Sequence, residues 1–296
     1  MSLVATLVSA HGQAPLDDAL LARLRDAAGG TATTARLDGA IAADLFADAA
    51  DARKLEAALR TALDGLPVDV IVQPAATRRK RLFLADMDST MIGQECIDEL
   101  ADYVGLREKV SDITERAMRG ELAFEPALRE RVALLKGVPL SVIEEIIRER
   151  ITLTAGGREL VRTMRANGHY TALVSGGFTV FTGPIGAMIG FDEDRSNLLL
   201  GQDGLLSGEV GEPILGKQAK LDTLVELRER LGVAPALTMA VGDGANDLAM
   251  LGEAGLGVAF RAKPAVAAAA AARLDHADLT ALLYAQGYRA DEIVRG

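Results

Sequence analysis

Short apolar runs alternate with amphipathic segments along the chain, and their order in the first 76 residues differs from that in the rest. Apolar residues spaced three and four apart indicate helices, whereas short runs of branched apolar residues indicate strands. The expected elements are a strand at 3–8, a helix at 17–28, two strands within 33–47, a helix at 51–63 and a strand at 68–72. This β-α-β-β-α-β order predicts a small ferredoxin-like α+β domain.

From residue 82 onward, short apolar strands alternate with helices. The predicted strands are residues 82–85, 170–174, 237–241 and 256–260. Such alternation is typical of an α/β protein with a Rossmann-like parallel sheet covered on both faces. A helical insertion at about residues 95–151 follows the first strand and is expected to form a cap over the carboxyl edge of the sheet, where open α/β folds bind ligands. The alanine-rich segment 265–272 is expected to be a helix.

These patterns predict two domains, residues 1–76 and residues 77–296. The segment between them contains Pro74 and the basic run Arg78-Arg79-Lys80-Arg81. Proline breaks regular structure, and a run of like charges is usually solvated. We therefore expect this segment to be a solvated linker.

Composition narrows the class of protein. The chain has 296 residues, of which 49% are hydrophobic and 25% charged, a balance typical of a soluble globular protein. The formal net charge of −10 argues against nonspecific nucleic-acid binding. The single cysteine, Cys96, excludes an internal disulfide and favours a reducing compartment. Because no apolar stretch approaches the roughly 18 residues that span a bilayer, and no secretory signal is evident, we expect a cytoplasmic protein without a membrane partner.

Two carboxylates follow the strand at 82–85, in the run Asp86-Met87-Asp88-Ser89-Thr90. On an extended backbone, Asp86 and Asp88 point to the same side. Such a pair suits Mg²⁺, and it also suits phosphoryl transfer in which one aspartate is the nucleophile and the other the general acid and base. A capped turn is the structural alternative, because Asp, Ser and Thr favour helix starts.

Three further segments carry candidate chemistry. The glycine-rich turn Gly242–Asp247 follows the strand at 237–241, and its Asp243 and Asp247 could complete a metal site. Ser175-Gly176-Gly177 follows the strand at 170–174 and could bind a phosphate. Lys220 could offset phosphoryl charge. Taken alone, these could equally be a helix cap, a generic turn and a solvated lysine.

In this order, the four segments resemble the four motifs of the haloacid dehalogenase-like phosphohydrolases. Members that hydrolyse phosphoserine are the most similar, through the stretches DMDSTMIGQECIDELA, AMRGELAFEPALRERVALLKG, VSGGF and AVGDGANDLAML. The resemblance covers about residues 80–290. By element order, residues 1–76 resemble the ACT-like N-terminal domain of longer bacterial members, a regulatory or dimerisation domain.

The resemblance implies a role for each matching position. Asp86 would be the nucleophile that forms an aspartyl-phosphate, and Asp88 the general acid and base. One Mg²⁺ would be held by Asp86, the backbone carbonyl of Asp88, and Asp243. The phosphoryl group and substrate would be bound by Ser175, Gly176, Lys220 and Asn246, with Gly177 and Asp247 in support.

The resemblance also places four residues of the insertion at the substrate. Glu95 would pair with the substrate ammonium and Arg131 with its carboxylate, where a two-pronged guanidinium suits two oxygens. Met118 and Phe124 would be apolar neighbours of the substrate. By spacing alone, the two charged residues could lie on solvated helix faces and the two apolar residues in the core of the insertion.

The resulting hypothesis is a Mg²⁺-dependent hydrolase that converts O-phospho-L-serine to L-serine and phosphate, the last step of L-serine biosynthesis. A homodimer through the N-terminal domain is possible. One alternative is a phosphatase or phosphotransferase that acts on another small phosphate ester. A second alternative is an amino-acid-sensing protein with a vestigial phosphatase domain.

Overall fold

The computed structural model describes residues 2–10, 13, 15–118 and 121–295, without the side chains of Ala117 and Met118. The chain divides into two compact units, each described by itself. Unit 1 consists of Met1–Leu84, Thr154–Thr171 and Leu224–Gly296, and unit 2 of Ala85–Leu153 and Ala172–Thr223. The division into domains 1–76 and 77–296 stays a prediction.

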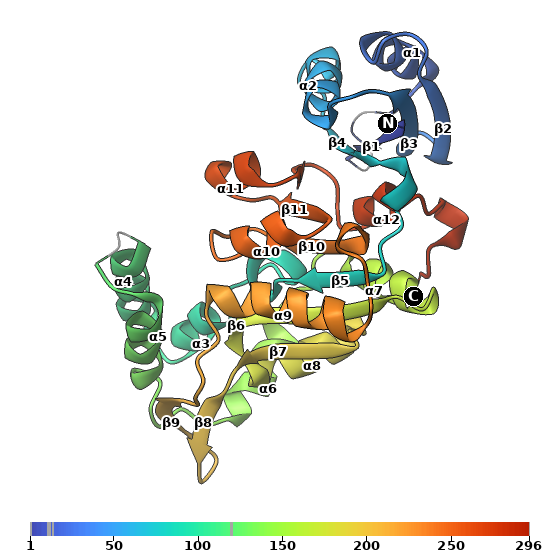
Figure 1. Ribbon diagram of the computed structural model, residues 1–296. Helices are drawn as coiled ribbons and strands as arrows, with labels where there is room; N and C mark the ends of the chain where they lie inside the picture. Colours follow the sequence, from blue (N-terminus) through green and yellow to red (C-terminus); the bar gives the residue numbers. More distant parts are fainter. Residues whose placement is uncertain (1, 11–12, 14, 119–120, 296) are drawn as a thin grey trace. The chain divides into compact units, whose positions relative to one another are not determined.

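The N-terminal part of unit 1 is an antiparallel sheet with two helices (Figure 1). Its elements are β1 Ser2–Ser9, α1 Asp18–Ala27, β2 Thr33–Asp38, β3 Ala42–Asp48, α2 Ala52–Leu63 and β4 Val68–Pro74. The strand order is β2-β3-β1-β4. The predicted β-α-β-β-α-β order is therefore confirmed.

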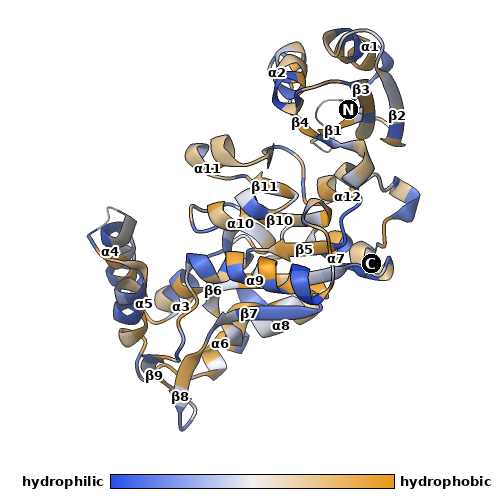
Figure 2. Ribbon diagram, in the orientation of Figure 1, coloured by the Kyte–Doolittle hydropathy of each residue, from blue (hydrophilic) through white to orange (hydrophobic). Residues whose placement is uncertain are grey.

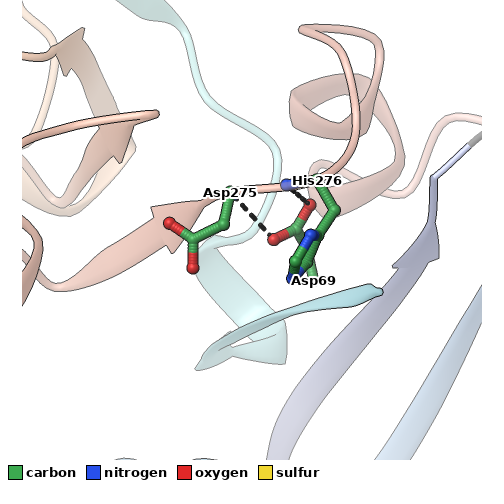
Figure 3. Close-up of side chains that lie close together, drawn as sticks. All are labelled: Asp69, Asp275 and His276. Atoms are coloured by element: carbon green, nitrogen blue, oxygen red, sulfur yellow. Dashed lines mark hydrogen bonds between the residues drawn. The ribbon is translucent and has the colours of Figure 1, made fainter. Parts of the chain in front are cut away.

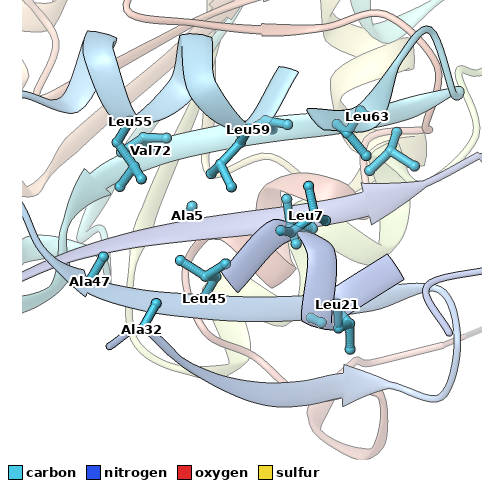
Figure 4. Close-up of a cluster of buried hydrophobic side chains, with 14 of the residues drawn as sticks. Ala5, Leu7, Leu21, Ala32, Leu45, Ala47, Leu55, Leu59, Leu63 and Val72 are labelled. Carbon is cyan, nitrogen blue, oxygen red and sulfur yellow. The ribbon is translucent and has the colours of Figure 1, made fainter. Parts of the chain in front are cut away.

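Both helices begin at aspartate caps and pack leucines on one face of this sheet. The side chain of Asp17 accepts a hydrogen bond from the backbone N–H of Leu20 at 2.7 Å, and Asp51 caps α2 in the same way. Leucines three and four residues apart lie against apolar residues of β1, β3 and β4 (Figure 4). This layer is the core of the N-terminal sheet.

The second sheet has six strands in the order β12-β11-β10-β5-β6-β7. They are β5 Leu82–Ala85, β6 Tyr170–Phe178, β7 Glu193–Asn197, β10 Thr238–Gly242, β11 Leu256–Phe260 and β12 Ala272–Leu274. Four of them were predicted, and β5 is hydrophobic throughout (Figure 2). Sequence patterns missed β7, which reads EDRSN, and β12, which has three residues. The alanine-rich helix ends at Ala269 rather than at residue 272, because β12 follows it.

The remaining elements connect these strands. The insertion after β5 holds an irregular turn at Met87–Met91, then α3 Cys96–Tyr103, α4 Arg107–Met118, α5 Phe124–Ala133 and α6 Ser141–Glu149. The other elements are α7 Gly157–Ala166, α8 Thr179–Ile189, β8 Leu199–Gln202, β9 Leu205–Val210, α9 Lys217–Arg230, α10 Leu248–Glu253, α11 Pro264–Ala269 and α12 Ala281–Ala285. In the described ranges, every helix is too short or too polar to cross a bilayer.

Contrary to the prediction, Arg78, Arg79 and Lys80 of the basic run after β4 are packed rather than solvated, and only Arg81 is exposed. Both terminal nitrogens of Arg78 bind the carboxylate of Asp44 at 2.8 Å. Arg78 also donates to the carbonyls of Tyr284 and Ala285 at 3.1 and 3.2 Å. These partners satisfy the guanidinium away from bulk water, so its charge is compatible with burial.

The next two residues of the run are also built into unit 1. The guanidinium of Arg79 lies 3.6 Å from the ring centroid of Tyr288, in a cation–π contact. Lys80 is fully buried, and its Nζ donates to the carbonyl of Ala236 at 3.0 Å. Burial lowers the pKa of Lys80 to about 8.

A second polar contact joins β4 to the segment after β12 (Figure 3). The buried carboxylate of Asp69 accepts the backbone N–H groups of Asp275, His276 and Ala277 at 2.8, 3.0 and 2.7 Å. The side chains of Asp69, Asp275 and His276 also lie close enough together to be possible metal ligands. Because the N–H groups already satisfy both oxygens of Asp69, its burial needs no cation.

The buried Lys80 predicts a pH-dependent stability. Between about pH 8 and pH 10.5 the unfolded lysine keeps its proton while the buried lysine releases it, so stability should rise with pH across this window. Chemical denaturation gives the free energy of unfolding of wild type and Lys80→Met at pH 7.5 and 9.5. The difference between the two proteins isolates Lys80, because every other titrating group contributes equally to both. Relative to Lys80→Met, the free energy of unfolding of the wild type should be larger at pH 9.5 than at pH 7.5. A pH-independent difference would contradict the prediction.

Candidate active site

The first acidic loop starts where β5 ends. Asp86 has an extended backbone and is 5% exposed, and its Oδ1 accepts the backbone N–H of Met87 at 2.8 Å. The following turn bends sharply, and Ser89 has a φ of +55°, which is uncommon for a residue other than glycine. Such strained conformations persist where surrounding structure fixes them, often at functional sites.

Lys220 lies against this carboxylate. Its Nζ is 2.6 Å from Oδ2 of Asp86, and both side chains are less than a tenth exposed. Two opposite charges buried together stabilise each other far more than they would in water. The lysine therefore holds the Asp86 carboxylate in place, with its charge paired, at the end of β5.

Asp88 lies beside carboxylates rather than a lysine. Burial first, and then the carboxylates of Glu95 and Asp86, raise the pKa of Asp88 well above its ordinary value. The backbone N–H of Cys96 donates weakly to its Oδ1 at 3.4 Å. Two neighbouring carboxyl groups that differ in this way suit a nucleophile beside a proton donor.

The loop at residues 175–177 bulges out of the sheet. Val174 pairs with Arg195 and Phe178 pairs with Asn197, so three residues of β6 lie opposite one residue of β7. Inside the bulge, the backbone N–H of Gly177 donates to Oγ of Ser175 at 2.8 Å. A Cβ on Gly177 would lie 3.4 Å from Oδ2 of Asp88. The structure therefore brings the predicted phosphate loop against the predicted acid and base.

Phe124, from the start of α5, covers two glycines of unit 2. A Cβ on Gly176 would lie 3.6 Å from Cζ of Phe124, and one on Gly216 would lie 3.5 Å from its Cδ1. The ring is nevertheless 42% exposed. Phe124 therefore lies beside the loop at residues 175–177; its contact with the substrate stays a prediction.

Glu95 and Arg131 are linked through electrostatics. Oγ of Ser89 donates to Oε1 of Glu95 at 2.7 Å. Burial lowers the pKa of the Arg131 guanidinium, while Asp98 and Glu95 oppose that effect. The two predicted recognition residues therefore share one electrostatic environment. Asp98 was missed by sequence analysis, because nothing in the pattern separates it from other acids of a first helical turn.

The other cap prediction, Met118, is the last residue of α4, and its side chain lies outside the described residues. Cys96 is buried next to Asp88. Burial and the adjacent carboxylate raise the pKa of the Cys96 thiol far beyond the physiological range. A thiol in such surroundings is poorly suited to form a thiolate.

The second acidic loop belongs to unit 1 and folds tightly on itself. The buried carboxylate of Asp247 accepts the backbone N–H of Gly244 at 3.0 Å. A Cβ on Gly242 would lie 2.3 Å from Cγ of Asp247, and one on Gly244 would lie 2.1 Å from Oδ1 of Asn246. Glycine is therefore required at 242, where a side chain would overlap the buried Asp247 carboxyl, whereas a side chain at 244 would displace the exposed amide of Asn246.

The two acidic loops follow neighbouring strands of the six-stranded sheet. β5 and β10 are neighbours in the six-stranded sheet. Asp86 follows the last residue of β5 and Asp243 follows the last residue of β10. Asp86 in unit 2, and Asp243 and Asp247 in unit 1, each offer carboxylate oxygens that could bind a metal ion. Carboxylate oxygens are the ligands that Mg²⁺ prefers, so this donor set fits the predicted cofactor.

A model of the haloacid dehalogenase-like hydrolase family matches residues 83–252. The chain is 45% identical over 218 residues to a phosphoserine phosphatase of Archaeoglobus fulgidus, across 73% of this chain and 62% of that protein. It is 44% identical over 224 residues to a phosphoserine phosphatase of a Polaromonas species, across 74% of this chain and 95% of that protein. The chain thus spans less than two thirds of the Archaeoglobus relative.

Two solved structures are also similar. A haloacid dehalogenase family hydrolase of Salmonella enterica serovar Typhi aligns with a TM-score of 0.84 at 29% identity, over 96% of this chain and 98% of that chain. A structure described as a phospho-aspartyl intermediate analogue of phosphoserine phosphatase aligns with a TM-score of 0.64 at 40% identity, over 70% and 98%. The predicted fold class is confirmed.

Alanine substitutions at Gly242 and Gly252 should differ in their effect on stability. Gly242→Ala should lower the free energy of unfolding by about 1–3 kcal/mol, because the new methyl group overlaps the buried Asp247 carboxyl. Gly252→Ala is the control, since it lies in α10 with open space around it and should be neutral or stabilising. Urea denaturation measures both, and equal effects would refute the stated role of Gly242.

Proposed function

The chain belongs to the haloacid dehalogenase-like hydrolases, and from this premise we propose that it is a phosphoserine phosphatase. It would hydrolyse O-phospho-L-serine to L-serine and phosphate, the last step of L-serine biosynthesis. The observation that carries the proposal is the buried Asp86–Lys220 pair at 2.6 Å, next to Asp88 with its raised pKa. An ionised nucleophile and a protonated acid are the two states that the first chemical step requires.

In the first step, a carboxylate oxygen of Asp86 forms a bond to phosphorus while the bond between phosphorus and the serine oxygen breaks. Asp88 donates its proton to the departing serine oxygen. In the second step, Asp88 accepts a proton from water as that water attacks phosphorus. The bond between phosphorus and Asp86 then breaks, which releases phosphate and restores both carboxyl groups.

The transferring phosphoryl group carries negative charge on its outer oxygens, and positive and N–H donors must meet it. Lys220 supplies a buried ammonium, the 175–177 loop supplies the hydroxyl of Ser175, and Gly176 would add its backbone N–H. Asp86, the backbone carbonyl of Asp88, and Asp243 would hold Mg²⁺. When bound, the metal supplies further positive charge at the phosphoryl oxygens.

The amino-acid end of the substrate would be recognised by residues of the insertion. Glu95 would accept the ammonium group, and Arg131 would bind the carboxylate through two parallel hydrogen bonds. Phe124 would cover the phosphate loop from the side of the insertion and exclude water during attack. This combination of charges favours an amino-acid phosphate over a phosphate ester without an ammonium group.

The relatives support phosphoserine as the substrate and an aspartyl-phosphate as the intermediate. Two proteins more than 40% identical to this chain are named phosphoserine phosphatases. A third, of solved structure, is described as an analogue of a phospho-aspartyl intermediate. We further propose that the protein acts in the cytoplasm, and that the N-terminal sheet binds an amino-acid effector or forms a homodimer.

Asp86→Asn should abolish turnover, with a loss of at least about 1000-fold in kcat, because the amide is not a nucleophile. The fold should persist, since the amide oxygen can still accept from Lys220. Phosphate release and denaturation curves check both points. Asp222→Asn is the matched control, because that aspartate is exposed on the same helix as Lys220. Wild-type-like phosphate release by Asp86→Asn would exclude the covalent mechanism.

Arg131→Ala tests the assignment of the substrate. It should lower kcat/KM for O-phospho-L-serine by about 100-fold or more, which corresponds to ~2.7 kcal/mol of lost binding in the transition state. Turnover of p-nitrophenyl phosphate, which has no carboxylate, should stay within about threefold of wild type. An equal loss on both substrates would contradict the recognition role and favour a phosphatase of another ester.

A further inference from the structure

Asn197 is a buried polar residue that no sequence motif singles out. It ends β7 and is 1% exposed. Its Nδ2 donates to the carbonyl of Gly176 at 2.9 Å and to the carbonyl of Leu215 at 3.2 Å. Its Oδ1 accepts the backbone N–H of Leu215 at 2.7 Å. One amide thus joins two segments that lie on either side of it in sequence.

The first segment is the bulge at 175–177, whose orientation depends on one peptide plane. The carbonyl of Gly176 and the N–H of Gly177 belong to the same planar unit and point in opposite directions. Because Asn197 binds the carbonyl, the N–H is directed to the other side, where it binds Oγ of Ser175 at 2.8 Å. That bond occupies a lone pair of Ser175 and leaves the hydroxyl hydrogen to donate.

The second segment leads into the helix that carries Lys220. Leu215 is bound through both its carbonyl and its N–H, which fixes its peptide groups in two directions. Gly216 follows, and α9 begins at Lys217, so Lys220 lies within the first turn of the helix. The amide of Asn197 therefore sets where this helix starts relative to the bulge.

Resting on the proposed function, we propose that Asn197 is a positioning residue for phosphoryl binding. It holds the Ser175 hydroxyl and the start of α9 at a fixed separation, so that Ser175 and Lys220 meet the same phosphoryl group. Asn197 does not touch the substrate. Its effect on catalysis passes through those two residues, and it should leave recognition of the amino-acid end unchanged.

Asn197→Asp tests this with little change in volume. A carboxylate oxygen replaces the donor and faces two carbonyl oxygens, which it repels. We expect kcat/KM to fall about 100-fold and the inhibition constant of inorganic phosphate to rise at least about tenfold, by loss of two phosphoryl contacts. The inhibition constant of L-serine should stay within about twofold, because Glu95 and Arg131 are untouched.

Two further variants control for folding and for chemistry. Asn197→Ser keeps one short donor and should give intermediate values for kcat/KM and phosphate inhibition, even if the aspartate variant does not fold. Asn167→Asp makes the same chemical change at the end of α7, where the amide donates to the carbonyl of Thr163 at 2.8 Å. It should leave both inhibition constants unchanged.

Equal losses of phosphate and L-serine affinity in Asn197→Ser would reduce Asn197 to a purely structural residue and overturn the inference. Wild-type phosphate inhibition in either folded Asn197 variant would also overturn it. A different result tests the proposed substrate. If wild type hydrolyses p-nitrophenyl phosphate but not phosphoserine, the proposed function fails, while phosphate inhibition of that reaction still tests Asn197.

Discussion

The contact between Asp86 and Lys220 is the constraint on which the candidate site depends. Removing two charges from water costs several kcal/mol for each ion, so such a pair persists only when its partners satisfy it. Here the Nζ to Oδ2 distance is 2.6 Å, and the N–H of Met87 binds the other carboxylate oxygen. The same low-dielectric surroundings raise the pKa of Asp88. The two neighbouring aspartates therefore lie in different surroundings: Asp86 is paired with a lysine, whereas Asp88 lies beside two carboxylates that raise its pKa.

Much of this arrangement could be predicted because it is local in sequence. The acidic loops directly follow apolar strands, and alternation places Asp86 and Asp88 on one side. By contrast, Asn197 has no local signal, since it lies in the polar strand EDRSN and acts through the register of a bulge. Arg78 was wrongly predicted to be solvated, because its carbonyl partner at Ala285 lies 207 positions further along the chain and leaves no local signal.

Hydrogen bonds from charged side chains to backbone groups join the N-terminal sheet to the rest of unit 1. Asp69 accepts three N–H groups after β12, whereas Arg78 donates to two carbonyls at the end of α12. Charged side chains that bind several backbone groups form stronger hydrogen bonds than neutral ones. The N-terminal sheet is thus held to the last segment of the chain by charged side chains.

The most direct test of the account is the selectivity of the wild-type enzyme, measured with Mg²⁺ and after chelation. The values of kcat/KM for O-phospho-L-serine, phosphothreonine, glycerol phosphate and p-nitrophenyl phosphate should be compared. We expect a preference of about 100-fold for phosphoserine, and we expect turnover to be lost on chelation. A flat, metal-dependent profile would contradict the substrate assignment. No turnover on any of the four would contradict the proposed activity and favour an amino-acid-sensing role.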